Sequence, residues 1–316
     1  MTHAYKNNYV FSGVLLIVAV LCVFYGRPVN AEHNCGVSVV IYSEVKASYQ
    51  SIFDRILNGI NKSCGDAPKM LQVDSSISLE DLEKVITDGK YSNVIALSNN
   101  IATKLNKLRL TNVTVIAGGF IYNDLSNSAL PPGYSLSINP QHYLDVLSSM
   151  SPNTKSLYVF YMPGRDEYVL DIFRRHTKKY GLTLIPQMAS NLDDFYANAK
   201  LLSDIKKGSN DAIFVTRSVL SLSISDTLNY LLKISWNRQL IFFSDLFSGV
   251  SRGILFSLFP DYYQYGILLG SALTGKTPER ALLLDTYKIT INSRTARHLG
   301  LVSSINNLGY NALIHE

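Results

Sequence analysis

Charged side chains that can hold a small polar molecule stand in loops that follow strand-like segments of the sequence. Arg165 and Arg217 lie in two such loops, and a guanidinium can bind a carboxylate through two parallel hydrogen bonds. Asp245 lies in a third loop and can pair with an ammonium group. These residue types suit a zwitterionic ligand. Two alternatives stay open: Arg165 can be a solvated loop charge beside Asp166 and Glu167, and a structural role fits Arg217 and Asp245 equally well.

Hydroxyl, amide and aromatic side chains in comparable loops complete the candidate ligand site. Several of these loops precede helical segments, whose N-terminal N–H groups can help to hold a carboxylate or a carbonyl. Plain helix capping explains the serine and asparagine residues as well, and most of the 20 tyrosines are expected to serve packing. The polar candidates are Ser43, Glu44, Ser98, Asn99, Asn100 and Thr216, and the aromatic candidates for stacking on the ligand are Tyr49, Phe120 and Tyr161.

The sequence contains no arrangement typical of catalysis, of a cofactor or of a metal. The six histidines suggest no catalytic triad. Gly275-Lys276-Thr277 lacks the upstream glycine-rich loop of a nucleotide-binding motif. Cys-x-x-Cys and His-Glu-x-x-His motifs are absent too. The formal charge of +5 is scattered along the chain without a basic patch. We therefore expect no enzyme activity, no cofactor, no metal and no nucleic-acid partner.

Alternating strands and helices must position these loops. Residues 36–42 form an apolar run typical of a buried parallel strand, and residues 49–62 carry an apolar helical stripe. A second series of the same kind begins at residues 157–161. Parallel strands need crossovers, which are usually helices, so the pattern predicts an α/β fold with two doubly wound parallel-sheet lobes. In such sheets, ligands bind beyond the carboxyl ends of the strands.

The N-terminal segment is predicted to be a signal peptide covering residues 1–31. Lys6 precedes an apolar run at residues 9–25, and Val29-Asn30-Ala31 offers small residues for cleavage before Glu32. An uncleaved membrane anchor is the alternative, since the run approaches the roughly 20 apolar residues of a membrane span. Lipid attachment at Cys22 is disfavoured by the bulky Leu21 before it. We expect an exported, periplasmic protein, anchored to the membrane if the segment is retained.

Removal of this segment leaves two cysteines, Cys35 and Cys64. Two thiols in an oxidising compartment are typical of one disulfide bond, which here closes a loop of about 30 residues. Two independent thiols are the alternative.

Four segments resemble one known family. Residues 156–181 (SLYVFYMPGRDEYVLDIFRRHTKKYG) and 260–266 (PDYYQYG) are followed by 273–278 (LTGKTP) and 289–301 (ITINSRTARHLGL). Their order and spacing resemble the substrate-binding proteins of ABC transporters. The resemblance implies a type I periplasmic-binding-protein fold whose lobes are joined by a hinge of three chain segments. It implies a first lobe of residues 32–138 and 255–285, and a second lobe of residues 139–254 and 286–316.

The resemblance also implies a function. Such proteins close around a small organic ligand, which in some relatives is an aromatic amino acid, and deliver it to an ABC permease. We expect a monomer with this role; the alternatives are a ligand-sensing module for a membrane signalling partner and, less favoured, an enzyme on the same scaffold. The loop at Gly118-Gly119-Phe120 departs from the family pattern, so the resemblance does not identify the ligand.

Overall fold

The computed structural model of this chain describes residues 35–315, apart from residues 109, 123–128, 276 and 307–311. The predicted signal peptide lies outside the described residues. No helix in the described part is long and apolar enough to cross a membrane.

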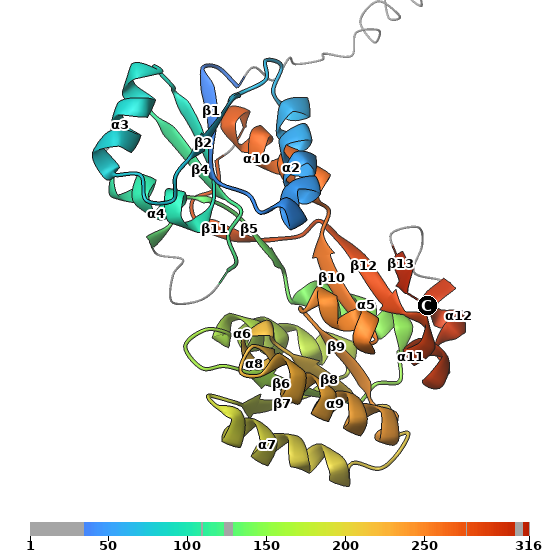
Figure 1. Cartoon of the computed structure of the whole chain (residues 1–316). Helices are drawn as coiled ribbons and strands as arrows, with labels where there is room; N and C mark the ends of the chain where they lie inside the picture. Colours follow the sequence, from blue (N-terminus) through green and yellow to red (C-terminus); the bar gives the residue numbers. More distant parts are fainter. Residues whose placement is uncertain (1–34, 109, 123–128, 276, 307–311, 316) are drawn as a thin grey trace, which may run out of the picture. The chain divides into compact units, whose positions relative to one another are not determined.

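The first lobe is built on a six-stranded, wholly parallel sheet (Figure 1). Helices α2 (Gln50–Ser63) and α10 (Tyr262–Thr274) cover one face, and α3 (Leu79–Asp88) and α4 (Asn99–Lys107) cover the other. Successive side chains of a strand point to opposite faces of the sheet. Because the strands are apolar at successive positions, both faces carry apolar side chains that pack against the helices. In spatial order the strands are β11 (Ala281–Leu284), β5 (Gly133–Ile138), β4 (Thr114–Gly118), β3 (Asn93–Leu97), β1 (Ser38–Ser43) and β2 (Lys69–Val73).

The second lobe is built on a seven-stranded sheet. Its strands are parallel except for the β10–β12 pair, which is antiparallel. The predicted parallel-sheet lobe is present, and the β10–β12 pair is the antiparallel pairing among its described strands. The chain leaves the second lobe at the end of β10 and re-enters it at β12, so the two strands run in opposite directions. The order is β13 (Ala312–His315), β12 (Tyr287–Asn292), β10 (Phe256–Pro260), β9 (Ile241–Ser244), β8 (Ala212–Val215), β6 (Ser156–Tyr161) and β7 (Thr183–Met188).

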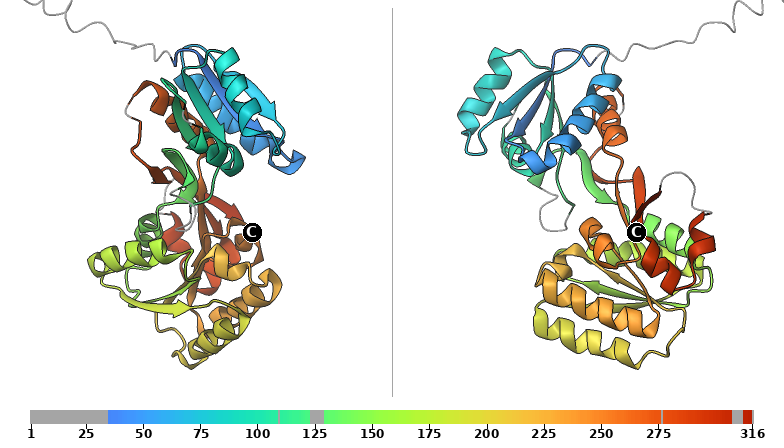
Figure 2. Two further views of the ribbon diagram at one scale, coloured as in Figure 1. Left: turned by 90° about the vertical axis from the view of Figure 1, so that its left-hand side faces the viewer. Right: turned by 45° about the vertical axis from the view of Figure 1, so that its right-hand side comes forward.

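Helices cover both faces of this sheet as well. On one face α5 (Gln141–Met150) and α6 (Glu167–His176) share an apolar core with β6, β8 and β9. On the other face α7 (Leu192–Leu201) and α9 (Ile224–Arg238) lie side by side (Figure 2). The shorter helices are α8 (Arg217–Leu220), α11 (Ser293–His298), α12 (Val302–Asn306) and the 3-10 segment η5 (Phe247–Arg252).

The chain passes between the two sheets three times: from β5 to α5, from β10 to α10 and from β11 to β12. The three-segment hinge is therefore present, although one lobe boundary differs from the expectation. Residues 255–260 were expected in the first lobe, but β10 pairs with β9 and β12 of the second sheet. Because these pairings satisfy the backbone groups of β10, the second crossing follows Pro260 rather than Ile254.

The predicted disulfide between Cys35 and Cys64 is present. It joins the segment before β1 to the residue that follows α2, with the two Cα atoms 5.2 Å apart and a sequence separation of 29. Replacing both cysteines by Ala is expected to lower the free energy of unfolding by about 3–4 kcal/mol, because the bond constrains the unfolded chain. Denaturant unfolding under non-reducing conditions measures this loss. Reduced wild-type protein is the control. The prediction is contradicted if neither the double substitution nor reduction of the wild type changes the unfolding curve.

Candidate functional site

A cavity of about 240 Å³ lies where the carboxyl ends of β8, β9 and β10 meet residues of the first lobe. The first lobe contributes side chains from the start of α2, from β5 and from the start of α10. The second lobe contributes side chains from α5, α6, α8, η5 and β10. The cavity thus lies at the strand ends where ligands bind in open α/β sheets.

The lining of the cavity is mostly aromatic and aliphatic. Among the described residues, its only charged lining side chains are those of Arg217 and Asp245. This combination of an apolar wall with a few convergent polar groups is typical of a small-molecule site. The aromatic lining residues are Tyr49, Tyr143, Tyr168, Phe214, Phe247, Phe259 and Tyr262.

Arg217 and Asp245 contact each other at the ends of two neighbouring strands. The backbone N–H of Arg217 donates to Asp245 Oδ1 at 2.5 Å, and the guanidinium Nη2 donates to the backbone carbonyl of Asp245 at 2.9 Å. Among the described residues, the Arg217 guanidinium forms no ion pair with a carboxylate. The cation and the carboxylate therefore lie close together without neutralising each other through a direct ion pair.

Burial raises the pKa of Asp245 from its ordinary value of 3.8 to about 6. The Arg217 charge opposes this shift, and the negative charge of Asp166 adds to it. Burial also raises the pKa of Tyr143 and of Tyr262, so both phenols stay neutral at physiological pH. Burial disfavours the ionised form of this carboxylate, so a cationic group of a ligand beside it would stabilise that form.

Asp166 supports the loop that carries Arg217, a role that the sequence did not reveal. The side chain is 5% exposed; Oδ2 accepts from Thr216 Oγ1 at 2.7 Å, and Oδ1 accepts from Ser218 Oγ at 2.8 Å. It also accepts from the backbone N–H of Met162 at 2.9 Å. Asp166 is therefore a buried link between the loops after β6 and β8, whereas its neighbour Arg165 is exposed.

Three of the sequence-predicted site residues line the cavity: Tyr49, Arg217 and Asp245. The structure does not bring the other nine into its lining. Tyr161 is partly buried at the end of β6, and Arg165 is exposed in the loop that follows. The remaining seven are Ser43, Glu44, Ser98, Asn99, Asn100, Phe120 and Thr216.

Local contacts explain most of these positions. The Ser98 hydroxyl caps α4 by accepting from Ile101 N at 3.2 Å, and the Thr216 hydroxyl caps α8. Asn100 Nδ2 donates to the backbone carbonyl of Ser75. Phe120 is 1% exposed and packs in the core of the first lobe. Ser98 thus caps a helix, as the capping alternative for the serine residues predicted, and Thr216 does the same.

The structure adds lining residues that sequence reasoning missed. Tyr143 reaches the cavity from α5 and its hydroxyl donates to the carbonyl of Leu258 at 3.4 Å. Phe259 and Tyr262 flank the second crossing, where β10 ends and α10 begins. A signal existed for Tyr262, because it lies in the PDYYQYG segment, one of the four segments that resemble the family. No comparable signal distinguished Tyr143 from an ordinary core residue.

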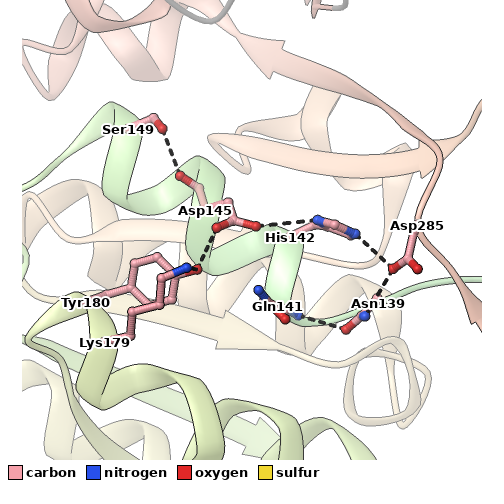
Figure 3. A network of polar contacts seen from close by, with 8 residues as sticks. All are labelled: Asn139, Gln141, His142, Asp145, Ser149, Lys179, Tyr180 and Asp285. Atoms are coloured by element: carbon pink, nitrogen blue, oxygen red, sulfur yellow. Dashed lines mark hydrogen bonds and ion pairs between the residues drawn. The ribbon is translucent and has the colours of Figure 1, made fainter.

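Polar contacts tie the three crossings to one another, and Figure 3 shows those between the first crossing and the third. Asn139 Nδ2 donates to Asp285 Oδ1 at 3.1 Å, and His142 Nε2 lies 3.0 Å from the same oxygen. These contacts join the first crossing to the third. Lys288 Nζ lies 3.3 Å from Asp261 Oδ2, which joins the third crossing to the second. The hinge segments are therefore connected by side chains as well as by strand pairing.

No protein-family model matches the sequence, and neither does any curated protein. Solved structures do match it. The ligand-free, open structure of a substrate-binding protein with adhesive properties from Clostridium difficile is 13% identical, with a TM-score of 0.63; the match covers 89% of this chain and 99% of that one. An ABC domain from Streptococcus pneumonia, in complex with L-Trp, is 16% identical, with a TM-score of 0.53 and coverage of 88% and 100%.

A third structure, a conserved domain protein from Vibrio cholerae, is 16% identical, with a TM-score of 0.52 and coverage of 89% and 99%. At these identities the likeness establishes the fold alone. The three matches cover 88–89% of this chain and therefore include both lobes. The chain has the type I periplasmic-binding-protein fold.

Proposed function

We propose that this protein binds a small zwitterionic organic molecule with an aromatic or apolar body and delivers it to an ABC importer. The observation that carries the proposal is the pair formed by Arg217 and Asp245, the charged side chains of an otherwise aromatic and aliphatic cavity. The Arg217 guanidinium has donors left for a ligand carboxylate, and Asp245 accepts a ligand ammonium.

The size and lining of the cavity support a ligand as small as an amino acid. Its volume of about 240 Å³ lies below the roughly 300–1,000 Å³ that is usual for drug-sized ligands. Rings at Tyr49, Phe247 and Tyr262 offer stacking surfaces. The Streptococcus structure with the same fold holds L-Trp, a molecule of this class.

Export and closure complete the proposal. The disulfide between Cys35 and Cys64 supports an oxidising compartment such as the periplasm. A ligand that touches both lobes favours the state in which they are closed, since only differential contacts shift such an equilibrium. We infer that a monomer presents the closed form to a membrane permease.

A thermal-shift screen of amino acids tests the proposal. A ligand that binds only the folded state at a hundredfold excess over its Kd is expected to raise Tm by about 5 °C. L-Tryptophan and L-phenylalanine are expected to act in this way. 3-Phenylpropionate, which lacks the ammonium group, and 2-phenylethylamine, which lacks the carboxylate, are expected to act weakly because each leaves one protein charge without its partner.

The Arg217→Ala variant is the matched control, since it keeps the backbone N–H that contacts Asp245 while removing the guanidinium. It is expected to lose the response to amino acids. The proposal fails if no zwitterion raises Tm, or if compounds that carry one charge act as strongly as amino acids do.

A further inference from the structure

A second cavity, of about 400 Å³, lies in the second lobe and shares no lining residue with the first. It is bordered by the C-terminal half of α9, the end of η5 and helix α11. We call it the basic cavity. The side chains that define it are those of Lys233, Trp236, Arg252, Arg294 and His298.

The charges around the basic cavity all have one sign. Lys233, Arg252 and Arg294 line it, and no described lining residue is acidic. None of these three cations forms an ion pair within the described part of the chain; Arg252 donates instead to the neutral Asn229 Oδ1 at 3.0 Å. Like charges that converge on one concave surface repel each other and concentrate positive potential there. An anion in the cavity removes this repulsion.

Aromatic stacking fixes part of the wall. The rings of Trp236 and His298 stack with centroids 3.7 Å apart and an interplanar angle of 4°. His298 Nε2 donates to the Trp236 carbonyl at 2.9 Å, and the Arg294 guanidinium lies 5.4 Å from the centre of the Trp236 ring. These contacts hold one of the cations in place before any ligand arrives. Yet Trp236 remains 39% exposed, which is unusual for so large an apolar side chain.

We propose that the basic cavity binds a phosphate group. Two guanidinium groups and one ammonium match the negative charge and the fork geometry of a phosphate group. The group can come from a soluble phosphate ester or from an anionic lipid headgroup, because an exposed tryptophan beside cations is also typical of a membrane–water interface. The proposal does not depend on which ligand occupies the cleft.

Trp236 is the only tryptophan of the chain, so its fluorescence reports directly on this cavity. We expect a saturable change in emission on titration with glycerol 3-phosphate, or with phosphatidylcholine vesicles that contain phosphatidylglycerol. Pure phosphatidylcholine vesicles are the control. A response to glycerol 3-phosphate assigns a soluble ligand, and a response to phosphatidylglycerol alone assigns a lipid headgroup. Added salt is expected to weaken either response.

The Lys233→Gln and Arg252→Gln variants locate the site, while Arg294 is left in place because it lies over the reporting ring. Each is expected to raise the Kd for the responding probe by about tenfold, the usual effect of losing a charge-assisted hydrogen bond. Lys200→Gln, an exposed change in the same lobe, and Asp245→Asn in the cleft are expected to leave it unchanged. The proposal is overturned if neither probe gives a saturable change, or if Lys233→Gln and Arg252→Gln both bind as the wild type does.

Discussion

Replacing Asp245 by Asn is expected to weaken ligand binding in the cleft by about 2–5 kcal/mol, the usual loss when one partner of a desolvated charge pair is removed. The same change is expected to stabilise the empty protein at neutral pH. Asn keeps an oxygen that can accept from the Arg217 N–H and removes a carboxylate whose ionised form burial disfavours. The ligand found in the thermal-shift screen serves for calorimetry.

The pH dependence separates this effect from general damage. The pKa of Asp245 is raised from 3.8 to about 6 in the folded state, so its protonated form stabilises the fold. That stabilisation is fully present below the unfolded pKa and is lost as the pH rises through about 6. The gain from Asp245→Asn is therefore expected above pH 6 and should vanish near pH 3.

Denaturant unfolding of both proteins at several pH values measures this difference in stability. Asp66→Asn, at an exposed loop position, is the matched control and should change neither stability nor binding. Two results would count against our interpretation. Unchanged affinity in Asp245→Asn removes this carboxylate from the ligand site, and lower stability at pH 7 contradicts the cost of burying its charge.

Replacing Gly266 by Ala is expected to lower the free energy of unfolding by about 3 kcal/mol, the upper end of what overpacking usually costs. In an exposed helix interior the same change stabilises by about 1 kcal/mol. Here α10 lies directly against α2, and a Cβ atom at Gly266 would lie 2.1 Å from the Ile56 carbonyl oxygen and 2.9 Å from Gly59 Cα. Both neighbours are backbone atoms, so the helices must separate.

Denaturant unfolding of Gly266→Ala measures this cost. Gln264→Ala, on the exposed side of the same helix, is the control and should stay within about 0.5 kcal/mol of the wild type. A Gly266→Ala protein as stable as the wild type would show that close approach of these helices contributes little. The disulfide is attached at Cys64, the residue that follows α2. The disulfide and the close glycine contact therefore both stabilise the packing of α2.

Much of the fold could be predicted because each strand and helix has its own local pattern. The apolar run at residues 36–42 predicted β1, observed as Ser38–Ser43, and the stripe at residues 49–62 predicted α2. The direction of β12 and the position of the second crossing could not be predicted in the same way. An apolar strand such as Phe256–Pro260 suits either sheet, and only its pairing with β9 and β12 decides which one it joins.

The candidate site was predictable only in part. The rule that ligands bind at carboxyl ends of strands identified Arg217 and Asp245, which directly follow β8 and β9. The same rule also selected Ser98 and Thr216, because a residue that caps a helix occupies the same kind of loop. Phe120 differs from a stacking ring only in its packing, which buries it in the first lobe. Tyr143 lies on a helix, and whether such a side chain lines the cavity depends on how the two lobes pack.

The contacts among the crossings restrict how the molecule can move. Asp285 contacts both Asn139 and His142, and Asp261 pairs with Lys288, so rotation of one connecting segment alone would break contacts to another. Independent torsion in each segment would allow the lobes to twist and slide. Because the segments are coupled, we expect these contacts to favour a bend between the lobes over twisting and sliding. Weakening either contact should add torsional modes and leave the bound state less uniquely defined.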